Sequence, residues 1–345
     1  MPELRKDPVS DRWVVISTER GRRPNDFGSI SVGSEANDSK FCPFEEGNEA
    51  KTPNEIVAYR RQGTQPNAPG WQVRVVPNRF PALRVEGEVS RSGVGIYDMM
   101  SGIGAHEVII ETPQHNLQLP DMAEEDVEKV LWAYKQRILD LQKDKRFRYV
   151  LVFKNYGKAA GASLAHPHSQ LIAMPITPRY VKMELTNCRE YFQQKERCIF
   201  CDMIRQELGS GERLVYESEY FVAITPFASR SPFEMWLMPR RHLASFIELP
   251  DEGMFQLAKC LKEVLLRLKK TLNDPPYNYV LHTAPNPVNR PGKPDYWGTL
   301  LYDFHWHIEI IPRLTNQAGF EWGSGLYINP TAPEEAAKYL REVKL

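Results

Sequence analysis

Two stretches of the chain carry hydrophobic residues at the three- and four-residue spacings of an amphipathic helix. Each stretch follows the tripeptide LPD, at 119–121 and at 249–251, and precedes a short apolar segment typical of a strand, at 149–155 and at 277–282. We therefore predict one long helix and a following strand in each half of the chain. The hydrophobic positions are Val127, Val130, Leu131, Tyr134, Ile138 and Leu141 in the first stretch, and Met254, Leu257, Leu261, Val264, Leu265 and Leu268 in the second.

These elements belong to a longer series that occurs twice in the same order. The series is C-x-x-[CE], a strand ending in His, LPD, the helix, a strand, a loop, and H-x-H opening an apolar strand, and its copies begin at Cys42 and Cys198. Such recurrence favours a tandem duplication. We predict an α+β fold of two similar units, with mainly antiparallel sheets each covered by a long helix. The units are expected at 1–180 and 195–345, with the boundary near 178–195.

Composition agrees with two domains and excludes several classes of protein. The 345 residues exceed the roughly 250–300 that one hydrophobic core serves. The 44 basic residues equal the 44 acidic ones, which gives no support for a nucleic-acid partner, although a local anion pocket remains open. The chain lacks an apolar N-terminal signal and a run of 18 apolar residues, and its five cysteines are too few for a disulfide framework. We expect a cytoplasmic protein that binds neither nucleic acid nor membrane.

The second copy offers the donor set of a metal site. Cys198, Cys201, His242 and His305 supply two thiolates and two imidazoles, which match a closed tetrahedral Zn²⁺ site. Because Cys201 and His242 are far apart in sequence, a folded sheet must bring them together. Two alternatives are buried free thiols beside ordinary surface histidines, and a redox C-x-x-C, which would require a thioredoxin-like βαβ pattern that is missing here.

The corresponding residues of the first copy are Cys42, Glu45, His115 and His166. Glu45 occupies the position at which the repeat would place a second cysteine. A carboxylate can bind zinc. Glu45 is nevertheless followed by Glu46 in a polar stretch and could be solvated, so both interpretations stay open.

The segment 154–171, KNYGKAAGASLAHPHSQL, combines a small-residue loop with a histidine pair. After the expected strand end at Asn155, Gly161 and Ser163 belong to a loop whose backbone amides could bind phosphate oxygens. Beyond the loop, the alternation of a strand would place His166, His168 and Gln170 on one face. This segment is our candidate catalytic site.

His168 is the candidate nucleophile, because the repeat assigns His166 to the metal set. A neutral imidazole can attack phosphorus and form a covalent intermediate, and its other nitrogen then needs an acceptor such as a backbone carbonyl. Gln170 could hydrogen-bond a non-bridging oxygen as charge builds in the transition state. The alternative is a pair of core or metal-bound histidines at a proline turn. His307, the counterpart of His168, lacks the small-residue loop, so we interpret the second half as a degenerate copy.

The segments ELRKDPVSDRWVVISTERGRRP, CPFE, VRVVPNRFPAL, GAHEVIIETPQH and GASLAHPHSQ resemble the galactose-1-phosphate uridylyltransferase family of the histidine-triad superfamily, and the resemblance extends over almost the whole chain. It implies two histidine-triad-like units, a homodimer and a role in galactose metabolism. It also implies ping-pong chemistry, in which His168 takes the uridylyl group of UDP-glucose, releases hexose 1-phosphate and passes the group to a second sugar phosphate such as galactose 1-phosphate. Gln170 stands where hydrolases of the superfamily have a third histidine, which favours transfer over hydrolysis.

The same resemblance implies further roles for individual residues. By motif, the substrate-binding residues are Arg20 and Arg23 near the phosphates, Asn78 and Phe80 at the nucleoside, Asn155 and Gly161 in the phosphate loop, and Phe320 and Glu321 at the sugar. Ser163 of the same loop is counted with His168 and Gln170 as a catalytic residue.

The chain departs from the family pattern at Glu45 and at Ser169, where uridylyltransferases commonly have glycine. Its tail, FEWGSGLYINPTAPEEAAKYLREV, also resembles the plant-type relative that phosphorolyses ADP-glucose. The alternatives are therefore ADP-glucose phosphorylase or adenylyl transfer, a nucleotide hydrolase, and a non-catalytic zinc module that binds nucleotide. Another second-site arrangement in the family would use Glu184, His282 and the H-x-H pair, and the second C-x-x-C argues against it.

Overall fold

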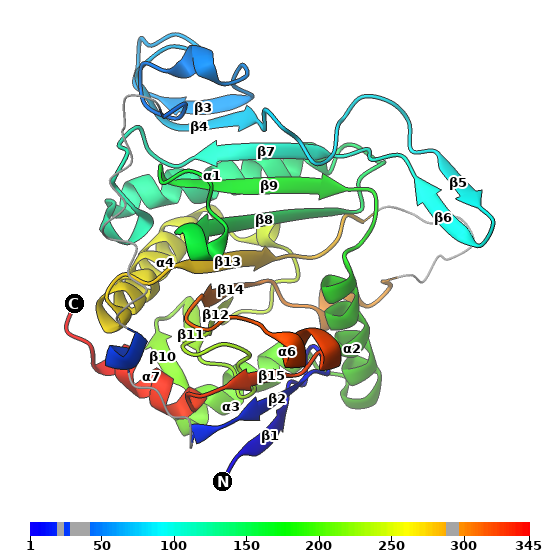
Figure 1. Cartoon of the computed structure of the whole chain (residues 1–345), viewed down its shortest axis with the longest axis vertical. Coiled ribbons are helices and arrows are strands. Elements are labelled where there is room, and N and C mark those ends of the chain that lie inside the picture. Colours follow the sequence, from blue (N-terminus) through cyan, green and yellow to red (C-terminus); the bar gives the residue numbers. More distant parts are fainter. Residues whose placement is uncertain (19–23, 28–41, 288–296) are drawn as a thin grey trace.

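A ten-stranded antiparallel sheet forms the centre of the molecule (Figure 1). The computed structural model describes residues 1–18, 24–27, 42–287 and 297–345. The strands, in spatial order, are β10 (Leu214–Glu217), β11 (Phe221–Ile224), β12 (Met235–Pro239), β14 (His307–Pro312), β13 (Tyr277–His282), β8 (Tyr149–Tyr156), β9 (His168–Met174), β7 (Ala105–Ile110), β4 (Trp71–Pro77) and β3 (Val57–Arg60).

The two predicted helices are present and pack against each other beside the sheet. They are α1 (Glu124–Leu141) and α4 (Asp251–Leu272). Their predicted hydrophobic positions are buried in one core cluster together with the sheet residues that face them. Burial of these apolar stripes against the sheet supplies the main favourable free energy of folding. The spacing rule therefore identified both helices.

The two halves contribute corresponding strands, and their sheets join into one. From the join outward, the first half runs β8, β9, β7, β4, β3 and the second runs β13, β14, β12, β11, β10. The join is the antiparallel pair β8–β13, in which Asn155 lies opposite Asn278. The α+β fold class of two similar units is confirmed, and the continuous sheet is a feature that the repeat alone did not reveal.

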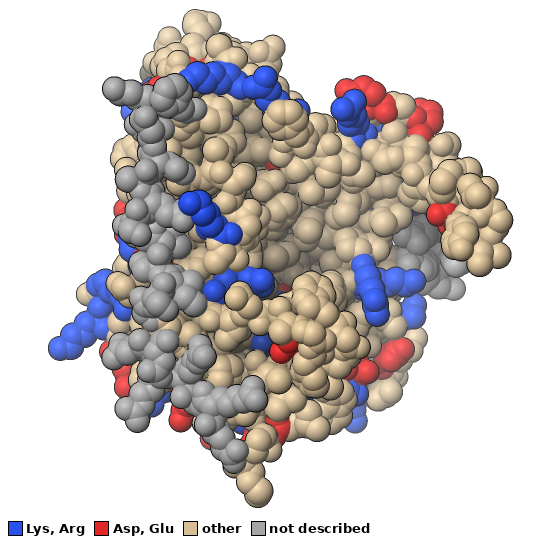
Figure 2. Space-filling model, in the orientation of Figure 1, with Lys and Arg blue, Asp and Glu red and all other residues tan. Residues whose placement is uncertain are grey.

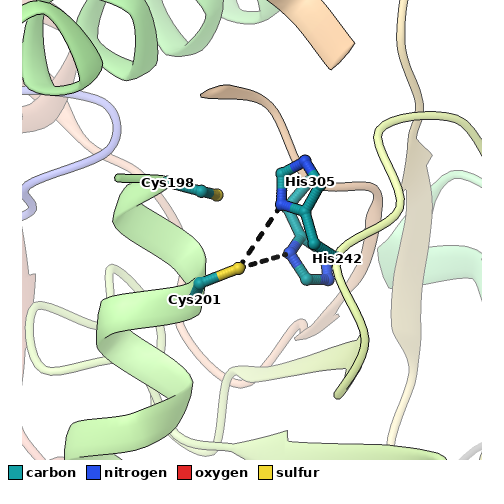
Figure 3. A group of neighbouring side chains, drawn as sticks. All are labelled: Cys198, Cys201, His242 and His305. Carbon is teal, nitrogen blue, oxygen red and sulfur yellow. Dashed lines mark hydrogen bonds between the residues drawn. The ribbon is translucent and has the colours of Figure 1, made fainter. Parts of the chain in front are cut away.

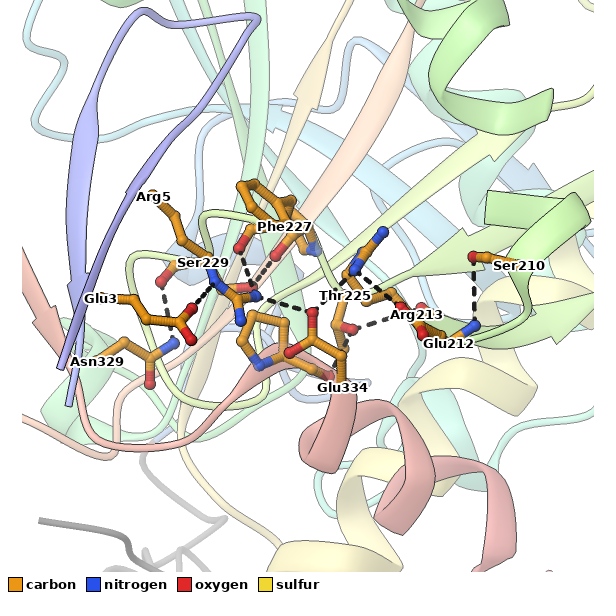
Figure 4. A network of polar contacts seen from close by, with 12 residues as sticks. Glu3, Arg5, Ser210, Glu212, Arg213, Thr225, Phe227, Ser229, Asn329 and Glu334 are labelled. Atoms are coloured by element: carbon orange, nitrogen blue, oxygen red, sulfur yellow. Dashed lines mark hydrogen bonds and ion pairs between the residues drawn. The ribbon is translucent and has the colours of Figure 1, made fainter. Parts of the chain in front are cut away.

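The N-terminal strands pack against the second half of the chain. Strand β2 (Trp13–Ile16) pairs with β1 (Glu3–Lys6) and, in parallel, with β15 (Tyr327–Asn329). Figure 4 shows the polar contacts around this junction. One carboxylate oxygen of Glu334, on α7 (Pro333–Glu342), accepts hydrogen bonds from Arg5 and Arg213, each at 2.8 Å. These contacts connect the two chain ends to the same unit.

The expected boundary segment forms a helix. Helix α2 (Arg179–Lys195) spans it and leads into α3 (Ile199–Ser210). The division at 178–195 stays a prediction. The remaining elements are the β5 (Arg91–Val94) and β6 (Tyr97–Met100) hairpin, the short helices α5 (Leu300–Asp303) and α6 (Gly319–Ser324), and the 3₁₀ turns 24–27, 49–51, 119–121, 158–160 and 246–248.

The surface shows little clustering of charge on the face seen in Figure 2, where lysine and arginine side chains stand apart among uncharged residues. The β5–β6 hairpin projects from the body of the molecule (Figure 1) and exposes Val94, Ile96, Tyr97 and Met99. In the described part of the chain, none of the helices combines the length and the apolar character needed to cross a bilayer.

Replacing Glu334 with alanine should lower the free energy of unfolding by about 1–2 kcal/mol, because two hydrogen bonds to charged groups are lost. Urea unfolding followed by circular dichroism measures the change. Glu335→Ala is the matched control, since Glu335 is exposed on the same helix and should shift stability by less than about 0.5 kcal/mol. Equal shifts in the two variants would contradict the role assigned to Glu334.

Candidate active site

Strand β9 presents His168 and Gln170 on the sheet face opposite to α1. Successive side chains of a strand point to opposite faces. Leu171 and Ala173 face the helix and lie in the core cluster, so His168 and Gln170 point the other way. There they line a cavity of about 310 Å³.

The cavity brings together five of the predicted site residues. These are Ser163, His168, Gln170, Asn78 and Phe80. Its other lining residues include the apolar Phe44, Val76, Val108 and Leu164 and the basic Lys51 and Arg79. A largely apolar pocket with a few converging polar groups is the usual form of a small-molecule site.

The geometry of His168 suits a nucleophile. Its Nδ1 lies 2.7 Å from the backbone oxygen of His166, as expected from the sequence. A carbonyl can only accept, so Nδ1 carries the proton and Nε2 keeps its lone pair. Burial is the main cause that lowers the pKa of His168 to about 4. The hydrogen bond to His166 raises the pKa, and the nearby Lys154 ammonium lowers it. The neutral, nucleophilic form is therefore favoured at neutral pH.

A buried ion pair lies behind the nucleophile. Lys154 Nζ donates to Glu111 at 2.5 Å and to the backbone oxygen of His168 at 3.3 Å. On the same side of β9, Tyr134 donates to the hydroxyl of Ser169 at 2.7 Å. Ser169, the departure noted in the sequence, thus takes part in a buried hydrogen bond.

His106 is a site residue that the sequence analysis missed. It lies on β7, and its Nε2 is 2.8 Å from Gln170 Oε1 and 3.1 Å from Asn78 Nδ2. The sequence showed the alternation along this strand, but not its pairing with β9. In a strand over 105–110, alternation places His106 on the same face as Val108, which lies opposite Gln170 in the register.

The phosphate-loop residues are only partly at the cavity. Gly157 and Gly161 have φ values of 81° and 88°, which glycine adopts readily. Asn155 Oδ1 accepts a hydrogen bond from Asn278 at 2.8 Å, at the join of the two halves. Ser163 lines the cavity, whereas Asn155 and Gly161 are not among its lining residues.

The remaining substrate-binding predictions fall elsewhere. Glu321 lines a separate cavity of about 140 Å³ together with Arg230 and Arg313, and this cavity shares no lining residue with the one at His168. Phe320, its neighbour on α6, is 47% exposed. Arg20 and Arg23 lie outside the described residues. Within one chain, the structure does not bring the predicted sugar end to His168.

The second-half donor set converges as predicted (Figure 3). The ligand atoms of Cys198, Cys201, His242 and His305 all lie within 4.8 Å of one another. Cys201 Sγ is 3.4 Å from Nδ1 of His242 and 3.7 Å from Nδ1 of His305. The hydrogen bond from Cys198 is the largest cause that lowers the pKa of Cys201, to about 3.

The outer nitrogens of these histidines are held as metal sites require. His242 Nε2 lies 2.9 Å from the oxygen of Leu301, and His305 Nε2 lies 2.8 Å from that of Pro239. Donation to these carbonyls leaves both Nδ1 lone pairs directed at the thiolates. The residues fit a tetrahedral metal ion.

The first-half donor set also converges, and Glu45 is part of it. Its Oε2 is 3.0 Å from His115 Nδ1 and 3.6 Å from His166 Nδ1, and all four predicted ligands are within 4.8 Å of one another. His166 Nε2 lies 2.8 Å from the Thr112 oxygen. The carboxylate therefore points at the donor set, where it could complete a metal site.

A third cluster corrects one argument from the sequence. Glu184, His282, His307 and Glu309 are buried and lie within 4.8 Å of one another, so the second C-x-x-C does not exclude this grouping. The set with Cys198 and Cys201 uses His305 of the H-x-H pair, and this third cluster uses His307. Glu309 also forms a close ion pair with Arg230.

His307 repeats the backbone contact of His168, but its ring is covered by other side chains. Its Nδ1 is 3.0 Å from the oxygen of His305. Its ring is fully buried and stacks on His282 and Trp236 at centroid distances of 4.7 and 5.4 Å. The ring of His307 is therefore enclosed by other rings, whereas His168 lines a cavity, which fits the interpretation of a degenerate copy.

Comparison with known proteins identifies relatives along the whole chain. The family models described as galactose-1-phosphate uridyl transferase, N-terminal domain and C-terminal domain, match residues 1–178 and 184–342. An ADP-glucose phosphorylase of Arabidopsis thaliana is 39% identical over 100% of this chain and 93% of its own length. A galactose-1-phosphate uridylyltransferase of Thermotoga maritima is 30% identical over 100% of this chain and 99% of its own length.

Two solved structures have the same fold. The Arabidopsis thaliana ADP-glucose phosphorylase with bound ADP-glucose superposes with a TM-score of 0.81 at 36% identity and full coverage of both chains. A uridylyltransferase structure superposes with a TM-score of 0.74 at 29% identity, covering 99% of this chain and 97% of the other.

The two donor sets predict that the purified protein binds metal. Cys198→Ser and Glu45→Gln should each lower the metal content, measured by plasma mass spectrometry, by about one equivalent, because each removes a ligand. Cys260→Ala is the control, since Cys260 is buried in α4 away from both sets. An unchanged metal content in Cys198→Ser would reject the second site.

Proposed function

This chain belongs to the galactose-1-phosphate uridyl transferase family, and from this premise we propose that it transfers a nucleoside monophosphate group from a nucleotide sugar to a phosphate-bearing acceptor through a covalent bond to His168. The observation that carries the proposal is the buried imidazole at the wall of the cavity, with Nδ1 bonded to the His166 oxygen and Nε2 unprotonated. An imidazole in this state attacks phosphorus without first losing a proton.

In the first step, His168 Nε2 attacks the α-phosphorus of the nucleotide sugar. The N–P bond forms as the bond from this phosphorus to the bridging oxygen breaks, and the sugar 1-phosphate leaves with the electron pair. The imidazole becomes positively charged, and the bond from Nδ1–H to the His166 oxygen strengthens with that charge. Gln170 lies on the same cavity wall and donates to a non-bridging oxygen of the reacting phosphate.

In the second step, a phosphate oxygen of the acceptor attacks the same phosphorus and the N–P bond breaks. The imidazole returns to its neutral form, so the cycle requires no net proton transfer. Gln170 cannot act as an acid because its amide does not release a proton in this pH range. This residue therefore favours a phosphate acceptor, which is already ionised, over water, which must lose a proton as it attacks.

For the substrates, we propose UDP-glucose as donor and a hexose 1-phosphate such as galactose 1-phosphate as acceptor. The family models along both halves and the Thermotoga maritima relative support this pair. A second candidate is ADP-glucose with inorganic phosphate. The 39% identity and the TM-score of 0.81 to the Arabidopsis thaliana ADP-glucose phosphorylase favour it.

We propose Zn²⁺ for both donor sets, on the basis of their thiolate, imidazole and carboxylate ligands. The backbone oxygen of His166 orients the nucleophile. An ion in the first-half donor set would fix the position of His166, because the side chain of this residue would be one of the ligands. The ion would supply rigidity to this segment, and the reacting atoms remain those of His168 and the substrate.

We also propose a homodimer, supported by the exposed apolar side chains of the β5–β6 hairpin and by the separation of Glu321 from the His168 cavity. A second copy could bring the sugar end of one chain to the nucleophile of the other. None of the five cysteines, all of which are described, forms a disulfide, and this suits a reducing compartment and supports a cytoplasmic location.

Incubation with a nucleotide sugar should produce a covalent adduct detectable by intact mass spectrometry. UDP-glucose should add about 306 Da and ADP-glucose about 329 Da, the masses of the uridylyl and adenylyl groups. The larger yield identifies the nucleotide. Addition of galactose 1-phosphate or of inorganic phosphate should then remove the adduct, and the faster acceptor identifies the second substrate.

His168→Asn is the control for this experiment, because it keeps an amide near the position of Nδ1 and lacks the nucleophilic Nε2. It should form no adduct while retaining the circular dichroism spectrum of the unaltered protein. A folded protein that forms no adduct with either nucleotide sugar would overturn the covalent mechanism.

The rate of adduct formation should be almost constant from pH 8 to about pH 5.5. A free imidazole has a pKa near 6.5, whereas burial lowers that of His168 to about 4. In the folded protein His168 therefore stays neutral between pH 6.5 and pH 4, where a free imidazole would be protonated. It becomes protonated only as the pH falls towards 4. Rapid-quench measurements after a pH jump test this, and a midpoint near 6.5 would contradict the account of His168.

A further inference from the structure

His106 lies beside the cavity and contacts Gln170 and Asn78. The residue is half-buried on β7 and lies opposite Ile172 of β9, so that Gln170 is its diagonal neighbour on the same face. Diagonal cross-strand neighbours are within reach of long side chains. The contact from His106 Nε2 to Gln170 Oε1 measures 2.8 Å.

The hydrogen bonds around the His106 ring determine its tautomer. The backbone N–H of Ala82 donates to Nδ1 at 3.1 Å, so Nδ1 must be unprotonated. In the neutral ring the proton is therefore on Nε2. The Asn78 amide nitrogen, 3.1 Å away, is itself a donor, because its partner oxygen Oδ1 accepts from the Phe80 backbone N–H at 2.9 Å. Gln170 Oε1 is thus the acceptor for the Nε2 proton.

We propose that His106 is a positioning residue that fixes the side-chain amide of Gln170 with its oxygen towards β7 and its NH₂ group towards the cavity. A free glutamine amide can rotate by half a turn and present either its acceptor or its donors to a ligand. A phosphate oxygen is an acceptor, so only the orientation with the NH₂ group towards the cavity stabilises charge on the reacting phosphate. Among the described residues, the amide nitrogen of Gln170 has no protein partner that would compete for it.

The inference rests on the proposed nucleotidyl transfer and adds a residue to it. A wrongly oriented amide would place an oxygen beside the phosphate oxygens, so loss of the His106 donor should slow formation of the His168 adduct by about tenfold to a hundredfold. This loss of rate is smaller than the 10²- to 10³-fold loss that is typical when a transition-state hydrogen-bond donor is removed completely. Substrate affinity should change by less than about threefold, because the charge on these oxygens is redistributed only as the bond to the leaving group breaks.

A structural role for His106 is the competing explanation, since the ring also accepts a bond from Ala82 and its backbone oxygen accepts one from Asn78 at 2.8 Å. Two substitutions separate the roles. His106→Asn can keep an acceptor at the position of Nδ1 for Ala82 but has no atom to reach Gln170. His106→Gln offers an N–H donor at the position of Nε2 but loses the acceptor for Ala82.

Single-turnover adduct formation with the nucleotide sugar identified above should therefore be slow in His106→Asn and within about threefold of the unaltered protein in His106→Gln. In a Gln170→Ala background, His106→Asn should add less than about a twofold change, because the two residues act as one unit. The reverse order, with His106→Gln slow and His106→Asn normal, would mean that His106 acts by holding Ala82 in place, and would overturn the inference.

The outcomes for the two proposals are distinguishable. If the unaltered protein forms no adduct, the proposed function is rejected together with the role of His106 in it. If it forms the adduct and His106→Asn reacts at the same rate, the function stands and the positioning role of His106 is rejected. An equal loss in the presence and absence of Gln170 would also reject it, since His106 would then act by another route.

Discussion

The bond between His168 Nδ1 and the backbone oxygen of His166 is the constraint on which the site depends. It joins two functions through one peptide segment, because the side chain of His166 belongs to a metal-type donor set while its carbonyl orients the nucleophile. The bond fixes the tautomer of His168, and burial keeps the ring neutral. Contacts that fix the position of His166 therefore also fix the direction of His168 Nε2 towards the cavity.

In the second half the same backbone contact holds a histidine whose ring is buried. His307 makes the same bond to His305, and the donor set of His305 is likewise complete. The ring of His307, however, is packed between His282 and Trp236, so no ligand can reach it. The two halves share this backbone arrangement. Among the described residues, a cavity opens at His168 of the first half, whereas other rings cover His307 of the second.

Sequence patterns predicted those parts of the molecule that depend on local spacing or on a repeat. The two long helices, the strands that follow them and both donor sets follow from hydrophobic periodicity and aligned motifs. The β8–β13 join and the pairing of β2 with β15 involve residues far apart in the chain, for which one sequence carries no pairing signal. The contact of His106 with Gln170 was missed for the same reason, as it depends on the register of β7 against β9. Helix α2 was missed because its residues were interpreted as a boundary.

The most direct test of the central claim is the identity of the nitrogen that carries the nucleotide. Protein labelled with ¹⁵N-histidine, trapped with nucleotide sugar in the absence of acceptor, can be examined by ³¹P–¹⁵N correlation spectroscopy. Because Nδ1 of His168 donates its proton to the backbone oxygen of His166, we expect a single phosphorus coupled to Nε2 of His168. Phosphorus bound to Nδ1, to another histidine, or to no histidine nitrogen in the adduct would contradict it.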